Sequence, residues 1–179
     1  GKIIGGGLPV AYKPDEDLPS IEDFAAAITP MLNDYTVFLE PGRPIVADAG
    51  VLIAEVLYIK KQAGQTFIVT DASMAELIRP ALYQAHHEII PVQQSNKDFH
   101  SPATVVGPVC ETADVLGRDR LLPELQPDGL MAILTSGAYG MVMASNYNAR
   151  PRPAEVVVLP DGDTWKIARQ RETWNDLIR

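Results

Sequence analysis

The sequence pattern changes near residue 50, and this change restricts the possible folds more than any other feature. Residues 1–50 alternate between strand-like and helix-like segments, an order that is typical of a parallel α/β layer. The remainder, residues 51–179, is dominated by β-branched runs separated by turn residues, which favours a mainly antiparallel barrel or sandwich. These runs cover residues 51–59, 66–70, 88–92, 103–109, 130–134 and 155–159. We therefore predict a piece of α/β barrel followed by a β domain.

Helical segments are expected at four places. Ser20 is a good N-cap, and the acidic residues Glu22 and Asp23 follow it in the first turn. Apolar residues then recur at helical spacing as far as Leu32. Shorter helices are predicted over 74–85, 138–146 and 173–178, where they would interrupt or close the β domain.

Charge and cysteine content exclude several classes of function. The chain has 15 basic and 23 acidic residues, so its formal charge of −8 argues against nucleic acid or an anionic membrane as a partner. Cys110 is the only cysteine, which rules out an intrachain disulfide and fits a reducing cytoplasm. No apolar stretch approaches the length of a membrane span. We therefore expect a cytoplasmic protein.

Two glycine-containing loops follow the predicted strands of the first region. Gly5, Gly6 and Gly7 would let backbone N–H groups approach a phosphate, although a flexible turn explains the same residues. Glu40-Pro41-Gly42-Arg43 follows the next strand, and the strand ends of a β/α barrel build its active site. Arg43 could bind a carboxylate there, or it could simply pair with Glu40.

The β domain carries three further candidate groups, each of which also has a purely structural interpretation. Arg79 and Tyr83 lie one turn apart around a proline that favours a helix start, so both could face one small anion; a packed tyrosine and a solvated arginine are the alternative. Cys110 ends an apolar strand and precedes Glu111, so it is either a buried hydrophobe or a proton donor in a cleft. Tyr139 stands between small residues that suit both a ligand contact and a tight turn. The spacing of His86 and His87 is wrong for two ligands on one helical face, so we expect no metal site.

Together, these segments resemble the diaminopimelate decarboxylase family of pyridoxal-phosphate enzymes, which combine an alanine-racemase-like TIM-type (β/α)8 barrel with a β domain. The resemblance covers nearly the whole chain, in the order of the family. The motifs that carry it are GGGLPVAY (5–12), EPGR (40–43), ELIRPALYQAHHEI (76–89), GPVCETAD (107–114), SGAYG (136–140) and ASNYNARPRPAEV (144–156). It implies that residues 1–50 are the last strands and helices of the barrel and that residues 51–179 are the C-terminal β domain.

The resemblance also implies a role for each matching residue. The cofactor, pyridoxal 5′-phosphate, would be held by the glycine loop, by the segment that follows the next strand, and by the tyrosine of the SGAYG motif. The substrate, a small amino acid, would be held at its distal end by two arginines, a glutamate and two tyrosines. The proton donor after decarboxylation would be Cys110, acting with Glu111 in the active site of the other subunit of a homodimer. The cofactor contacts are Gly5, Gly6, Gly7, Glu40, Pro41, Gly42, Arg43 and Tyr139, and the substrate contacts are Arg43, Arg79, Tyr83, Glu111 and Tyr139.

Among the reactions that the resemblance implies, it favours the conversion of meso-diaminopimelate to L-lysine and carbon dioxide. Related ornithine and arginine decarboxylases have an aspartate after the cysteine, and this chain has Glu111. Two alternatives stay open, namely a decarboxylase of another amino acid and a non-catalytic dimerisation module. None of the lysines lies in the setting of the cofactor lysine of the family. We therefore expect a missing N-terminal barrel half that carries this lysine, and no turnover by the 179-residue chain alone.

Overall fold

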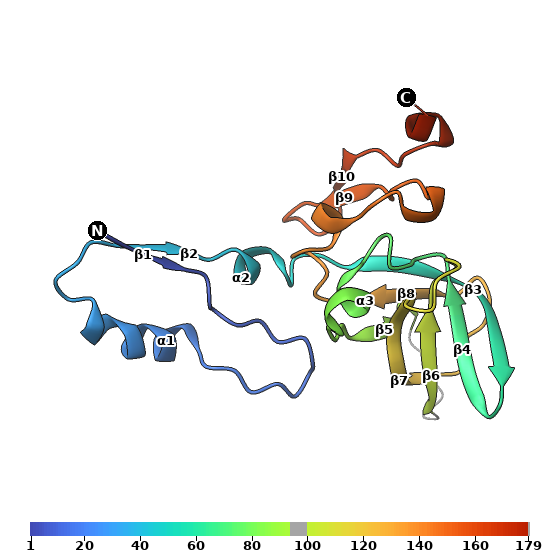
Figure 1. Cartoon of the computed structure of the whole chain (residues 1–179), viewed down its shortest axis with the longest axis horizontal. Helices are drawn as coiled ribbons and strands as arrows, with labels where there is room; N and C mark the ends of the chain where they lie inside the picture. The colour runs from blue at the N-terminus through green and yellow to red at the C-terminus, as the bar shows by residue number, and fades with distance from the viewer. Residues whose placement is uncertain (94–99, 179) are drawn as a thin grey trace.

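Residues 1–93 and 100–178 are described by the computed structural model, which Figure 1 shows as a ribbon. The first 50 residues form an α/β segment that extends away from a six-stranded sheet, and the C-terminal residues form a small hairpin at another side of that sheet (Figure 1). The change of architecture therefore falls close to the position where the sequence pattern changes. The domain limits themselves, 1–50 and 51–179, stay a prediction.

The N-terminal segment is a β-α-β unit. Strands β1 (Lys2–Gly5) and β2 (Val37–Glu40) pair in parallel, and helix α1 (Ile21–Ile28) lies between them in the chain. Ser20 caps α1 as predicted, because its side-chain oxygen accepts from the Asp23 N–H at 3.0 Å and the Asp23 carboxylate accepts from the Ser20 N–H at 3.1 Å. Such units occur in several α/β folds, so the assignment to a TIM-type barrel stays a prediction.

The central sheet has the strand order β5-β8-β3-β4-β6-β7. Its strands are β3 (Leu52–Gln62), β4 (Gln65–Thr70), β5 (Ile89–Pro91), β6 (His100–Val106), β7 (Val115–Pro123) and β8 (Leu130–Ile133). The long strand β3 pairs with β8 through its first half and with β4 through its second half, with a register shift between Val56 and Tyr58. One bent strand therefore connects the two halves of the sheet.

The central sheet of the β domain is mixed, with one parallel pair that the sequence analysis did not predict. Strand β4 pairs with β6 in parallel, whereas the other neighbouring pairs of this sheet are antiparallel. The chain between β4 and β6 crosses over through helix α3 (Arg79–Tyr83) and β5 before it returns beside β4. The apolar pattern of a strand does not specify its partner, so the sequence could not reveal this crossover.

The sheet curls until its two edge strands meet. A Cβ placed on Gly117 of β7 would lie 2.9 Å from the Ile89 Cδ1 of β5. The enclosed side is filled by apolar side chains that are almost completely buried. They are Ala54, Val56, Ile68, Ala72, Leu77, Ile89, Ala103, Val105, Leu116, Leu122, Met131 and Ile133. The domain is thus a nearly closed barrel with a packed interior.

Two strands escaped the sequence analysis, namely β7 and β10 (Trp165–Arg169). Strand β7 contains the polar run Arg118-Asp119-Arg120, and Asp119 adopts a φ of +51° at an irregularity in the pairing with β6. Strand β10 pairs with β9 (Glu155–Val158) in a separate antiparallel hairpin. The helix expected over 138–146 is only a short 3-10 helix at Met141–Met143, and the one expected over 173–178 is a 3-10 helix at Trp174–Ile178. A further 3-10 turn, at Tyr147–Ala149, was not expected.

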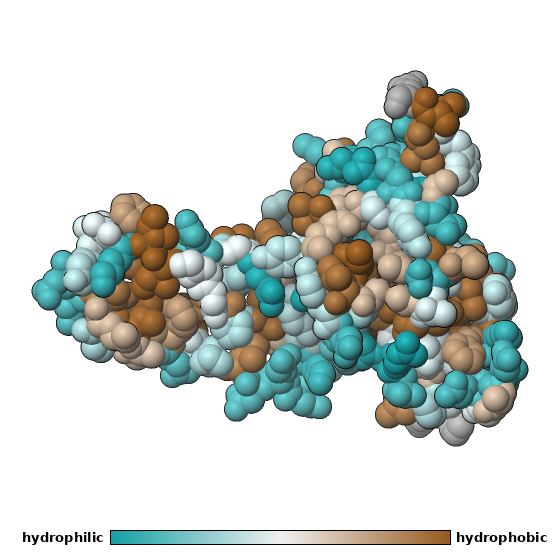
Figure 2. Space-filling view, viewed as in Figure 1, coloured by the Kyte–Doolittle hydropathy of each residue, from teal (hydrophilic) through white to brown (hydrophobic). Residues whose placement is uncertain are grey.

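Large apolar side chains are exposed at both ends of the chain. Figure 2 shows brown residues over the N-terminal segment and again near the C-terminus. The large exposed apolar side chains include Ile3, Phe38 and Leu39 of the first strand pair, and Trp165 and Val158 of the last. Within the described residues, no helix is both long and apolar enough to cross a membrane.

Candidate active site

The two predicted phosphate-binding loops lie side by side at the carboxyl ends of β1 and β2. Gly5 pairs with Glu40, and a Cβ on Gly6 would lie 3.4 Å from the Glu40 carbonyl oxygen. Gly7 has a φ of +105°, a conformation that other residues rarely adopt. The parallel pairing therefore brings residues 5–7 and 40–43 together, although more than thirty residues separate them in the chain.

The space beside these loops is open. A Cβ on Gly5, Gly7 or Gly42 would meet no other atom within 4 Å. Backbone N–H groups in such a loop can approach an anion without obstruction by side chains. Pro41 and Gly42 then lead into helix α2 (Arg43–Val46). The residues present therefore fit a phosphate group.

The SGAYG segment is fastened directly to the end of α2. The Ser136 N–H donates to the Gly50 carbonyl at 2.8 Å, and the Gly137 N–H donates to the Ala47 carbonyl at 3.0 Å. A Cβ on Gly137 would lie 1.8 Å from the Val46 carbonyl oxygen, so only glycine allows this approach. These bonds place Tyr139 next to the helix that begins with Arg43.

Arg43 lies between two tyrosine rings. Its guanidinium carbon is 5.6 Å from the ring centre of Tyr139 and 6.0 Å from that of Tyr12. These distances fall within the range of cation–π contacts. Within the described residues, no ion pair joins Arg43 to Glu40, so the structural alternative for Arg43 is not supported. Tyr139 has a φ of +60°, a left-handed conformation that is uncommon for a tyrosine and found at strained turns.

Arg79 is buried, with only 7% of its surface exposed. Its Nη1 atom lies 2.9 Å from the Nε2 of His87, and its guanidinium carbon lies 4.6 Å from the ring centre of Tyr12. Tyr83, one turn further along α3, is 61% exposed. The structure therefore brings Arg43 and Arg79 together at the ring of Tyr12, with Tyr139 on Arg43, whereas the described contacts do not join Tyr83 to this group.

Cys110 and Glu111 lie on a tight loop organised by Asp114. The buried Asp114 carboxylate accepts from the Met74 N–H at 2.7 Å and from the Val109 N–H at 2.9 Å. Gly107 packs closely against the same carboxylate. Burial raises the pKa of Asp114, and the two backbone donors oppose this shift. The loop is thus well fixed even though Cys110 itself is exposed.

Tyr147 joins this loop through Glu111. The Tyr147 hydroxyl donates to Glu111 Oε2 at 3.3 Å, and hydrogen bonds from the Ala113 N–H and the Thr112 hydroxyl hold the pKa of Glu111 below its usual value. Both Glu111 and Tyr147 are exposed. Among the contacts of residues 1–93 and 100–178, none connects Cys110 or Glu111 with Arg43, Arg79 or Tyr139. The predicted site residues therefore form two separate groups.

Two arginine–carboxylate pairs hold the segment that carries Tyr147. Arg150 pairs with the buried Glu76 at 3.2 Å, and Arg152 pairs with Glu172. Glu172 also accepts from the Asn146 side chain at 2.6 Å, and the hydrogen bonds from Arg152 lower its pKa to about 2. These pairs connect the loop after SGAYG to both the sheet domain and the C-terminal segment.

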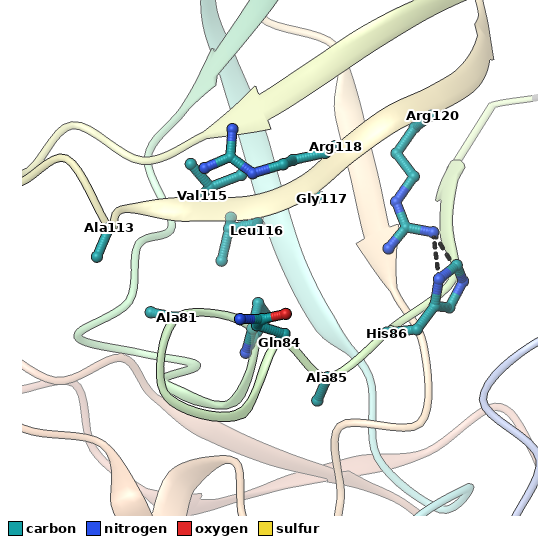
Figure 3. A pocket seen from close by; sticks show the side chains of 11 residues that line it. Ala81, Gln84, Ala85, His86, Ala113, Val115, Leu116, Gly117, Arg118 and Arg120 are labelled. Atoms are coloured by element: carbon teal, nitrogen blue, oxygen red, sulfur yellow. Dashed lines mark hydrogen bonds between the residues drawn. The ribbon is translucent and has the colours of Figure 1, made fainter.

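His86, the neighbour of His87, faces a different region. It contributes to a cavity of about 550 Å³ between α3 and β7, which Figure 3 shows from close by. Arg120 lies against its ring at 2.7 Å, and Glu88 lies 3.1 Å from its Nε2 atom. Within the described residues no cluster of three metal-ligating side chains occurs.

Comparison with known proteins places this arrangement in a family. The sequence pattern of the family described as pyridoxal-dependent decarboxylase, C-terminal sheet domain, matches residues 16–137. The chain belongs to this family. The match begins at Glu16, after the glycine loop, and ends at Gly137, so it includes the six-stranded sheet together with Arg79, Cys110 and Glu111.

Individual pyridoxal-dependent decarboxylases resemble the chain over nearly its whole length. The diaminopimelate decarboxylase of Vibrio cholerae is 46% identical over 97% of this chain, which covers 41% of that protein. The crystal structure of the Helicobacter pylori diaminopimelate decarboxylase with L-lysine superimposes with a TM-score of 0.89 at 42% identity, over 98% of this chain and 43% of that one. The lysine/ornithine decarboxylase of Vibrio vulnificus with cadaverine is more distant, with a TM-score of 0.74 and 29% identity over 84% of this chain and 42% of that one. The chain therefore spans about two fifths of the length of these relatives.

The sequence analysis assigned no role to four residues that organise the site. They are Tyr12 and His87, which surround Arg79, and Asp114 and Tyr147, which support Cys110 and Glu111. All four stand inside motifs that the analysis did single out, and polar residues in such motifs were the available signal. Tyr12 and Tyr147 are far along the chain from Arg79 and Glu111, so these two contacts could not be foreseen.

Proposed function

We propose that the chain is the C-terminal part of a pyridoxal-phosphate-dependent decarboxylase that converts meso-diaminopimelate to L-lysine and carbon dioxide. The observation that carries this proposal is that Arg43, Arg79 and Tyr139, which come from three separate motifs, lie in one cluster: both arginines lie against the ring of Tyr12, and Arg43 also lies against the ring of Tyr139. Family membership and the high similarity to diaminopimelate decarboxylases support it. The proposal includes the activity of the whole protein, of which this chain is a part, and a cytoplasmic location.

The cofactor phosphate would be held by residues 5–7 and by Glu40 to Arg43. Their backbones are adjacent, and the space beside three of their glycines is open. Tyr139 would contact the cofactor from the opposite loop, because the bonds of Ser136 and Gly137 fix it beside α2. When bound, pyridoxal phosphate supplies an electron sink for the electrons that remain when carbon dioxide leaves.

The two arginines would select a substrate with a second carboxylate. A guanidinium forms two parallel hydrogen bonds with a carboxylate, and a buried guanidinium such as that of Arg79 does so with little competition from water. Glu111 would accept a hydrogen bond from the distal ammonium, since its lowered pKa keeps it ionised at neutral pH. Tyr83 would complete the substrate contacts from the exposed end of α3.

Cys110 would donate the proton that replaces the departing carboxylate. A thiol held near the reacting carbon is a suitable general acid. Cys110 and Glu111 are exposed on a loop that makes no described contact with the arginine group, which supports a homodimer in which they complete the active site of the partner. An exposed yet rigid loop suits this role, because it costs little entropy to dock.

Substrate profiling of the full-length protein with added pyridoxal phosphate tests the proposal. Carbon dioxide release from meso-diaminopimelate should exceed release from L-lysine, L-ornithine or L-arginine by roughly 100-fold or more, because only the first has the second carboxylate that pairs with Arg79. Preference for a substrate with a single carboxylate would instead favour a decarboxylase for another amino acid. No turnover of any of the four substrates would favour the dimerisation module.

A further inference from the structure

Arg79 is surrounded by side chains that have no role in the proposed chemistry. His87 is completely buried, and its Nε2 lies 2.9 Å from Arg79 Nη1. The ring of Tyr12 lies over the guanidinium at 4.6 Å and meets the His87 ring edge-on, with ring centres 5.2 Å apart and planes at 79°. Three side chains from two distant parts of the chain therefore form one packed unit.

The hydrogen bonds of His87 define its tautomer. Its Nδ1 lies 2.9 Å from the Leu134 carbonyl oxygen, which can only accept, so Nδ1 carries the hydrogen. The Nε2 atom of the neutral ring then has a free lone pair, and Arg79 donates to it. A protonated ring would instead direct an N–H group at the guanidinium, and burial lowers the pKa of His87 to about 4. His87 is therefore a fixed acceptor for Arg79 at neutral pH.

Tyr12 fixes the other side of the guanidinium and connects it with the glycine loop. It follows Gly7 by five positions, and its ring also lies 6.0 Å from Arg43. A flexible arginine side chain loses considerable rotamer freedom when it binds a ligand, and this loss is smaller when the side chain is already held. A hydrogen bond to His87 and a ring contact with Tyr12 together restrict the position and the orientation of the Arg79 guanidinium.

We propose that His87 and Tyr12 are positioning residues that hold the Arg79 guanidinium ready for the distal carboxylate of the substrate. This inference rests on the proposed function, because it requires a carboxylate ligand at Arg79. Neither residue needs to touch the substrate. Their removal should therefore weaken the binding of a ligand that has the distal carboxylate, but not the binding of a ligand that lacks it.

L-Lysine and cadaverine form a suitable pair of probes, because they differ only by one carboxylate. Calorimetry on the full-length holoenzyme should show that His87→Leu raises the Kd of L-lysine roughly tenfold or more, since an unpaired buried guanidinium is costly, while the Kd of cadaverine changes less than about twofold. His86→Leu is the matched control, because it removes the adjacent imidazole, which does not contact Arg79. It should leave both Kd values unchanged.

The inference is overturned if His87→Leu weakens both ligands equally, or if it weakens neither. If His87→Leu does not fold, Tyr12→Leu is tested in the same way, by comparing its effects on the Kd of L-lysine and of cadaverine. We expect the Kd of L-lysine alone to rise, by roughly threefold or more. Tyr12→Phe keeps the ring and should restore the Kd of L-lysine. An unchanged ratio in Tyr12→Leu overturns the inference. Turnover of meso-diaminopimelate by the unaltered protein separately decides the proposed function, so the two failures are distinguishable.

Discussion

The surroundings of Arg79 and of Cys110 are built in opposite ways. Arg79 is buried, and its guanidinium is fixed by a neutral imidazole and an aromatic ring. Cys110 is exposed, and only the backbone around it is fixed, through the buried carboxylate of Asp114. One region preorganises a side chain, and the other preorganises a loop.

This difference agrees with the tasks that we propose for the two regions. A cation that selects a carboxylate gains from burial, because electrostatic attraction is stronger where water is excluded. A proton donor that must reach the active site of a second subunit has to stand on the surface of its own. The comparison thus predicts that damage to the two regions will have different kinetic consequences.

The largest expected effect is the loss of the proton donor. In the full-length enzyme, Cys110→Ala should lower kcat by roughly 100-fold or more with little change in KM, because a general acid acts only in the chemical step. Arg79→Ala should mainly raise KM. Steady-state kinetics with meso-diaminopimelate measure both, and a KM effect as large as the kcat effect in Cys110→Ala would contradict the proposed division.

Mixing the two variants sharpens the comparison, provided that activity is measured at a substrate concentration well below the KM of Arg79→Ala. If Cys110 acts in the partner, a heterodimer of Cys110→Ala and Arg79→Ala subunits has one intact active site, so random mixing should restore about a quarter of the unaltered activity in a twofold-symmetric dimer. Activity after refolding or coexpression of the mixture measures this. No recovery would mean that both residues serve the same subunit.

Gly137→Ala should disturb only the arginine region. The added Cβ would collide with the Val46 carbonyl and separate Tyr139 from Arg43, at a cost above roughly 2 kcal/mol in unfolding free energy. Gly64→Ala is the control: it lies in the two-residue turn between β3 and β4 at a φ of +77° with open space around it, so we expect about 1 kcal/mol from backbone strain alone. If denaturant unfolding shows that the two variants lose the same unfolding free energy, the close contact of Gly137 with Val46 is not needed for stability.

The pH dependence of stability separates the regions further. His87 has a folded-state pKa of about 4, below the ordinary value of 6.5, under the influence of burial and of Arg79, His86 and Arg120. The neutral His87 therefore contributes at most about 3 kcal/mol to the free energy of unfolding. This contribution is complete above pH 6.5 and is lost as the pH falls from 6.5 through 4. Thermal unfolding across this window should show a smaller pH slope in His87→Leu than in the unaltered protein. Identical slopes would exclude a buried neutral His87.

The smallest effect is expected on the side of Cys110. Glu172 supports the Tyr147 segment, and its pKa is lowered from 4.5 to about 2 by Arg152. Its contribution is therefore present above pH 4.5 and is lost as the pH falls from 4.5 through 2. Because both side chains are only partly buried, the loss should be small, and Glu172→Gln should remove it from the unfolding profile. If Glu172→Gln instead altered the pH dependence of stability between pH 6.5 and 4.5, this assignment would be wrong.

The sequence by itself determined the local elements and the family. The capping residue Ser20, the strands at 2–5 and 37–40, and most strands of the sheet follow from short patterns and were predicted close to their true positions. The motifs that contain Arg43, Arg79, Cys110 and Tyr139 led to the family that the comparisons confirm. Such features depend on residues that are near each other in the chain.

Only the tertiary structure decided which of these residues meet. The parallel pairing of β4 and β6, the contact of Gly137 with Val46, and the enclosure of Arg79 by His87 and Tyr12 all join segments that are distant in sequence. A local pattern specifies which face of an element is buried, but it contains no information about what covers that face. The division into a buried arginine group and an exposed cysteine loop is therefore a property of the packing.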